Sequence, residues 1–159
     1  MRVSRLAVGI GERLGLGAVD IRALERAALV HDAGKLCVPD TILNKPGALD
    51  GDEWEIIKQH TLAGESIGFE ATGDADLARL IRSHHERLDG TGYPDRLTDA
   101  DIPLTVRALQ VADIFDALTS DRAYKPAYPA ARAVTMLERE VERGWRDPAV
   151  VAALVATLS

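Results

Sequence analysis

The chain has 159 residues, of which 47% are hydrophobic and 28% charged, with a formal net charge of −6. This length and composition predict one folded domain rather than a disordered segment. The acidic charge excludes broad electrostatic binding to nucleic acids or anionic membranes, so we expect no DNA, RNA or membrane partner. A lone cysteine, Cys37, excludes an internal disulfide, and no apolar run is long enough to span a membrane. These features favour a cytoplasmic protein.

Apolar residues recur at helical spacing along most of the chain, first over residues 3–16 and then more strongly over 20–34. A stretch rich in proline and glycine, 36–52, predicts an ordered loop. The next helix, over 50–69, should bury Trp54. Further helices are expected over 74–85, 104–120, 130–144 and 147–158. No strand, repeat or linker is evident, so the sequence predicts an all-α fold with a single domain spanning 1–159.

Imidazole and carboxylate side chains that suit a metal occur on four of the expected helices. They are His31, Asp32, His60, His84, His85 and Asp113. A mixed shell of nitrogen and oxygen ligands suits iron, manganese, zinc or nickel better than magnesium or calcium. One histidine on a helix is usually structural or faces solvent, so the alternative is a set of scattered polar positions.

The motifs around these residues resemble those of the HD-GYP domain, a helical branch of the HD metallohydrolases. They read "HDAGK", "KQHTLAGE", "HHERLDGTGYP" and "DRAYK", and the resemblance runs from about Ala23 to the C-terminus. "HD" alone is a weak signal, whereas the combination is highly specific. The resemblance implies a single HD-type bundle of about six to eight helices. Characterised members hydrolyse cyclic di-GMP at a centre of two or three metal ions.

The resemblance also implies a role for each matching side chain. Two divalent ions are expected, iron or manganese, with zinc and nickel as alternatives, and Asp32 would bridge them. Lys35 would act beside Asp32 in catalysis. The implied metal ligands are His31, Asp32, His60, His84, His85 and Asp113, and the implied substrate-binding residues are Arg122, Lys125, Tyr93, Gly92 and Pro94.

The function implied is a phosphodiesterase that cleaves cyclic di-GMP to linear pGpG, to GMP or to both, in bacterial second-messenger signalling. A regulatory domain or signalling protein is the expected partner, and the apolar face of the first helix would suit a homodimer. Two alternatives stay open. One is a catalytically impaired module that binds a nucleotide or a protein, and the other is an HD hydrolase for another nucleotide.

Two departures from the family pattern bear on these expectations. Members usually carry a further histidine at a position that would precede Arg2, so the first helix is incomplete relative to the family. One metal would then be short of a ligand, which favours the impaired alternative. Relatives tend to have a glycine-rich segment with phenylalanine before Asp-Pro, where this chain reads "ERGWRDP".

Overall fold

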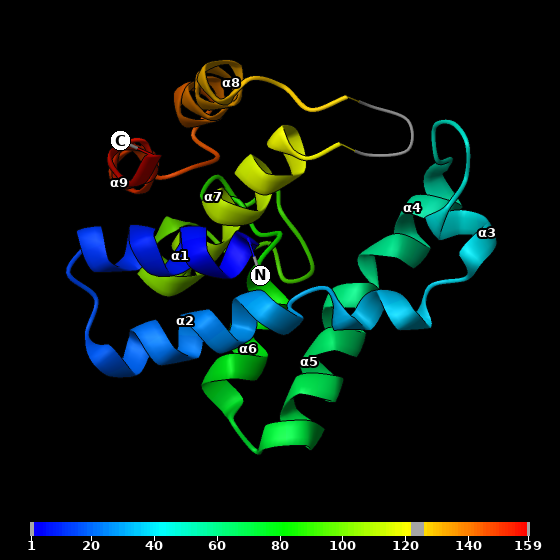
Figure 1. The fold of residues 1–159 in the computed structure, drawn as a ribbon. Helices are drawn as coiled ribbons and strands as arrows, with labels where there is room; N and C mark the ends of the chain where they lie inside the picture. The colour runs from blue at the N-terminus through cyan, green and yellow to red at the C-terminus, as the bar shows by residue number, and fades with distance from the viewer. Residues whose placement is uncertain (1, 122–125, 159) are drawn as a thin grey trace.

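The computed structural model describes residues 2–121 and 126–158. Within these ranges the chain forms helices and loops but no strand, so the all-α prediction is confirmed (Figure 1). The single-turn α3 apart, the described residues form eight longer α-helices, at the upper end of the expected number. The α-helices are α1 (Arg2–Arg13), α2 (Ala18–Val30), α3 (Asp40–Leu43), α4 (Gly51–Lys58), α5 (His60–Thr72), α6 (Ala75–Ser83), α7 (Leu104–Thr119), α8 (Ala130–Glu142) and α9 (Pro148–Leu158), and the 3-10 helices are η1 (Ala33–Cys37) and η2 (Asp99–Asp101).

The hydrophobic core lies between α1, α2, α6, α7, α8 and α9. Helix α1 packs against α2, α7 and α9, while α5 packs against α6 and η1 (Figure 1). Ile10, Leu24, Leu109 and Leu154 are fully buried, and they come from four different helices. Burying apolar side chains from separate helices stabilises their mutual arrangement, so α1, α2, α7 and α9 are held in fixed positions.

The helix expected over 50–69 is divided at Gln59 into α4 and α5. Asp50 begins α4 through a capping box with Glu53. At the break the backbone N–H of Gln59 donates to the carbonyl of Ile56 at 3.1 Å, a tighter turn than that of an α-helix. The ring Nδ1 of His60 lies 2.6 Å from the carbonyl of Ile57. His60 is the first residue of α5.

Two further expectations were wrong in detail. Helix α2 ends at Val30, with His31 as its C-cap, rather than at Gly34. Gly34 lies in η1, where a Cβ atom would collide with the backbone carbonyl of His60, so only glycine permits this close approach. Trp54 was expected to be buried, but 47% of its surface is exposed.

Among the residues described, no helix is both long and apolar enough to cross a membrane.

Candidate metal centre

The fold brings the predicted histidines together from separate helices. His31 caps the end of α2, His60 begins α5, and His84 caps the end of α6. His85 follows directly, and its ring centroid lies 5.1 Å from that of His60. Single ligand atoms of Asp32, His60, His84 and His85 all lie within 4.8 Å of one another. These four residues can hold one metal ion.

Three of the histidines are oriented by the same hydrogen bond. Nδ1 of His31, His60 and His84 lies 2.6–3.0 Å from the backbone carbonyl three residues earlier. A carbonyl oxygen only accepts, so Nδ1 carries the proton in each ring. The lone pair of each neutral imidazole is therefore on Nε2. This is the arrangement that second partners impose on histidine ligands of metals.

The two carboxylate oxygens of Asp32 face different histidines. Oδ1 lies 3.7 Å from Nε2 of His60 and 3.9 Å from Nε2 of His84. Oδ2 lies 3.7 Å from Nε2 of His31. Asp32 thus stands between His31 on one side and His60 and His84 on the other.

The second group of donors consists of His31, Asp32 and Asp113. Nε2 of His31 lies 3.4 Å from Oδ1 of Asp113. The same nitrogen is buried and has no hydrogen-bond partner among the residues described. This buried nitrogen therefore faces two carboxylates, one from Asp32 and one from Asp113. The second group offers three side chains, fewer than the first group.

The charges of the cluster suit metal binding at neutral pH. Burial lowers the pKa of His84 to about 4 and that of His85 to about 2, so both rings are neutral. Burial also lowers the pKa of His60. Burial alone would raise the pKa of Asp113, but the neighbouring His31 outweighs it, and the carboxyl group stays ionised. For His31 the burial effect is outweighed by Asp113 and Asp32, which raise its pKa.

Lys35 places a positive charge beside the cluster. Its Nζ lies 2.5 Å from Oδ2 of Asp32, with both side chains partly exposed. Burial would raise the pKa of Asp32, but Lys35 and His31 lower it. The positive charge of Lys35 is therefore placed at the oxygen that also faces His31.

The loop that follows the histidine pair places Tyr93 against His85. The two rings are stacked, with centroids 4.9 Å apart and planes inclined by 27°. Gly92 allows this path, because a Cβ atom there would collide with the backbone of Glu86 and Arg87. Gly90 has a φ of 78°, in the left-handed region that favours glycine.

The same loop is fixed by two side chains that sequence reasoning missed. The carboxylate of Glu86, which is fully buried, accepts hydrogen bonds from the backbone N–H groups of Asp95 and Leu97 at 2.6 and 3.1 Å. The guanidinium of Arg82 donates to both carboxylate oxygens of Asp95, at 2.6 and 2.7 Å. Glu86 follows the histidine pair directly, and that position was the only signal in the sequence.

Two buried side chains, those of Gln110 and Arg146, hold the backbone on either side of the histidine pair. The amide of Gln110 donates to the carbonyl of Ser83 at 3.2 Å. The guanidinium of Arg146 donates to the carbonyl of Glu86 and to the amide oxygen of Gln110, at 2.9 and 3.1 Å. The carbonyl of Ser83 also accepts the backbone N–H of Glu86 at 3.0 Å, so the chain that carries the two histidines is bonded at both ends. Sequence reasoning missed both Gln110 and Arg146.

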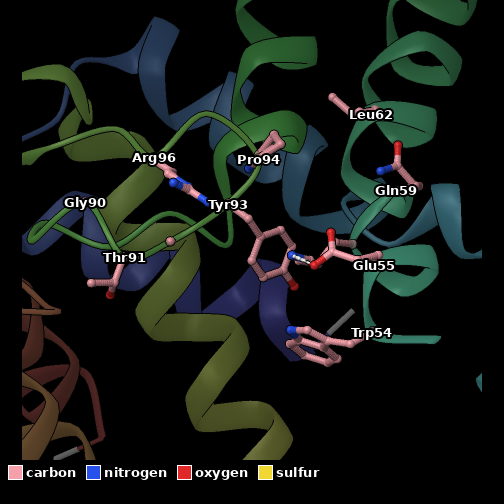
Figure 2. Close-up of a pocket in the computed structure, with 11 residues that line it drawn as sticks. Trp54, Glu55, Gln59, Leu62, Gly90, Thr91, Tyr93, Pro94 and Arg96 are labelled. Carbon is pink, nitrogen blue, oxygen red and sulfur yellow. Dashed lines mark hydrogen bonds and ion pairs between the residues drawn. The ribbon is translucent and has the colours of Figure 1, made fainter. Parts of the chain in front are cut away.

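A cavity of about 580 Å³ lies beside Tyr93, between its loop and α4 (Figure 2). The predicted pocket residues Gly92, Tyr93 and Pro94 line it, together with Trp54 and other side chains of α4 and α5. Arg122 and Lys125, predicted to bind phosphates, lie outside the described residues. The structure thus brings together all six predicted metal ligands and Lys35, and it adds a cavity on the far side of Tyr93.

A helical domain that gathers histidines around a His-Asp doublet has the form of an HD-type metal domain. The family model described as "HD domain" matches residues 1–150. Among solved structures, a HDG"Y"P protein of Bdellovibrio bacteriovorus has a TM-score of 0.78 at 23% identity, over 99% of this chain and 50% of that one. A cyclic GMP-AMP-specific phosphodiesterase of Vibrio cholerae has a TM-score of 0.57 at 35% identity, over 99% and 35%.

Curated relatives agree with this class. The chain is 41% identical over 150 residues to the 3'3'-cGAMP-specific phosphodiesterase 3 of Vibrio cholerae, covering 94% of this chain and 32% of the relative. It is 41% identical over 160 residues to the cyclic di-GMP phosphodiesterase response regulator RpfG of Xanthomonas campestris, covering 97% and 41%. The chain therefore belongs to the HD domain family and is of the HD-GYP type. It spans about a third to two fifths of the length of these relatives.

Proposed function

We propose that this chain is a metal-dependent phosphodiesterase domain that hydrolyses cyclic di-GMP to linear pGpG, to GMP or to both, in bacterial second-messenger signalling. The observation that carries the proposal is the position of Asp32, whose two oxygens face His31 on one side and His60 and His84 on the other. The names of the relatives, which include phosphodiesterases for cyclic di-GMP and for 3'3'-cGAMP, support a cyclic dinucleotide as the substrate.

The proposed cofactor is a pair of divalent ions, iron or manganese, with zinc and nickel as alternatives. One ion would be held by Asp32, His60, His84 and His85, and the other by His31, Asp32 and Asp113. Bound ions of this kind lower the pKa of a water molecule and neutralise charge on phosphoryl oxygens. The unprotonated Nε2 atoms of the imidazoles and the ionised carboxylates support this assignment, since metal ligands must be deprotonated.

Lys35 is the proposed catalytic cation. Its Nζ at Asp32 is placed to stabilise negative charge that develops on a phosphoryl oxygen, or to give a proton to the leaving oxygen. Arg122 and Lys125, which follow α7 in the sequence, are proposed to hold the phosphates. These cations would give an acidic protein a local positive field for an anionic substrate.

The loop of Gly92, Tyr93 and Pro94 is the proposed wall of the nucleotide site. Tyr93 is held against His85, so a base that contacts this tyrosine would lie next to the metal ligands. Hydrogen bonds with Glu86 and Arg82 fix the position of this loop beside the histidines.

We further propose that residues 1–159 act as one unit under the control of a regulatory domain or a signalling partner, with a second copy of the chain as another candidate partner. The response regulator among the relatives supports regulation by signalling.

The test is the metal content of the purified protein together with turnover. Protein loaded with manganese or iron(II) is incubated with cyclic di-GMP, and products are separated by chromatography. Formation of pGpG or GMP supports the proposal, and a Lys35→Met variant should lose most of this activity. Binding of cyclic di-GMP without turnover would favour a binding module instead, and turnover of a different nucleotide alone would favour another HD hydrolase.

A further inference from the structure

Trp54 is the feature of the cavity that the proposed function does not use. It lies on α4, 47% exposed, and lines the cavity of about 580 Å³ opposite the loop of Tyr93 (Figure 2). Its ring meets that of Tyr93 edge to face, with centroids 6.2 Å apart. A large, rigid aromatic surface left open to a cavity is suited to stacking on a planar ligand. The volume lies within the roughly 300–1,000 Å³ typical of small-molecule sites.

The polar groups next to Trp54 form a donor and acceptor pair. The carboxylate of Glu55 accepts from Nζ of Lys58 at 2.6 Å, and both side chains line the cavity. Lys58 also lies 5.9 Å from the centre of the Tyr93 ring. The cavity thus offers a carboxylate and an ammonium group side by side, within reach of a ring that rests on Trp54.

This arrangement is complementary to guanine. Guanine presents two neighbouring donors, N1–H and the N2 amino group, next to the acceptor O6. A carboxylate accepts both donors at once, and an ammonium group donates to O6. Adenine presents an unprotonated N1 where guanine has N1–H, so Glu55 would face a lone pair instead of a donor. The pair therefore distinguishes the two purines.

The position of the cavity fits a base of a cyclic dinucleotide. Tyr93 connects the cavity to the histidine cluster, because its ring contacts His85 and also lines the cavity. We propose that Trp54, Glu55 and Lys58 form a guanine-binding subsite, in which Trp54 stacks on the base and Glu55 reads its N1–H and N2 groups. The inference rests on the proposed function for the nature of the ligand, and it adds residues of α4 to the recognition of that ligand.

The subsite is tested by calorimetric titration of cyclic di-GMP and cyclic di-AMP into the metal-free protein, in which no turnover consumes the ligand. We expect at least about tenfold tighter binding of cyclic di-GMP, since a good bidentate contact to a base gives discrimination of this order. Glu55→Gln should lower the ratio of the two affinities about tenfold. Trp54→Ala should weaken both ligands about tenfold, because the stacking surface is lost whatever the base.

Matched controls come from α5, where Phe69 and Glu70 are also exposed but do not line this cavity. Phe69→Ala and Glu70→Gln should leave both affinities unchanged. The subsite is overturned if Glu55→Gln leaves the ratio unchanged, or if neither ligand binds to the metal-free wild-type protein.

Turnover of both cyclic dinucleotides by metal-loaded wild type and Glu55→Gln separates this inference from the proposed function. If binding is selective for guanine and depends on Glu55, but no metal-loaded form turns over either ligand, the subsite is supported and the phosphodiesterase activity is contradicted. If wild type and Glu55→Gln both turn over the cyclic dinucleotides with the same base preference, the phosphodiesterase activity is supported and the subsite is contradicted.

Discussion

Arg146 donates a hydrogen bond to the backbone carbonyl of Glu86 across 60 residues of sequence, and the two atoms are 2.9 Å apart. The guanidinium is 7% exposed and also bonds to Gln110 and to Glu140. These partners offset the cost of burying the charge. Arg146 therefore connects the segment between α8 and α9 to the chain that carries His84 and His85.

Replacement of Arg146 by methionine should destabilise the protein by about 2–4 kcal/mol, because a buried carbonyl and a buried amide oxygen lose their donor. Metal affinity should fall by about tenfold, as expected for a group that orients ligands from outside the shell. Urea unfolding and metal titration measure the two effects. Arg139→Met, at an exposed position of α8, is the control and should change neither.

Glu86→Gln should loosen the loop of Tyr93 while leaving the histidines in place. The two carboxylate oxygens of Glu86 accept from Asp95 and Leu97, whereas glutamine would turn an amino group towards one of these N–H donors. We expect faster hydrogen exchange at the amides of residues 95 and 97 and a loss of about 1–3 kcal/mol in stability. Unchanged exchange at these amides would show that the carboxylate does not anchor the loop.

Asp32→Asn and Asp113→Asn should differ in the number of metal ions that they remove. Asp32 faces both groups of histidines, so its replacement should weaken both ions. Asp113 lies near His31, and its replacement should weaken one ion only. Metal content measured after gel filtration distinguishes the two variants. Equal loss in both would contradict the shared position of Asp32.

The metal-free protein should lose stability as the pH falls from about 6.5 to about 4. Burial lowers the pKa of His60, His84 and His85, with that of His84 near 4, while the unfolded chain takes up protons near 6.5. Between these values the unfolded state binds more protons, so the free energy of unfolding decreases as the pH falls. His31, whose pKa is raised, acts in the opposite direction, but it is one histidine against three.

Asp32 and Asp113 affect the free energy of unfolding at lower pH than the histidines do, because their pKa values lie below the usual range of aspartate. Their stabilising effect is present above that range and is lost as the pH falls through their folded values. Chemical unfolding in a chelating buffer at several pH values measures the whole profile. His84→Gln should flatten the decrease between pH 6.5 and 4, and an equally steep decrease in this variant would exclude His84 as its source.

The fold class and the six candidate ligands could be predicted because each rests on a local pattern. Helical periodicity needs only a short window, and the motifs around His31 and His84 are contiguous in sequence. The break at Gln59 was not predictable in this way, since it lies inside a single helical pattern of apolar residues over 50–69. Trp54 fits a helical pattern, but its exposure depends on which elements pack against α4.

The contacts of the two buried donors near the histidine pair could not be predicted from the sequence either. Gln110 and Arg146 contact residues 27 and 60 positions away, and neither stands in a motif that marks it as a partner. Arginine before Asp-Pro was visible only as a departure from the family pattern. Its role follows from burial and from the carbonyl that it meets.

The bonds from the imidazoles to carbonyls three residues earlier have one further consequence. Each ring is fixed by backbone of its own helix or turn, so the rings of His31, His60 and His84 take their orientation when the chain folds. The conformational entropy of ordering these side chains is then lost during folding rather than during metal capture. An arriving ion meets a preorganised set of lone pairs, and the free energy of its coordination goes largely into affinity.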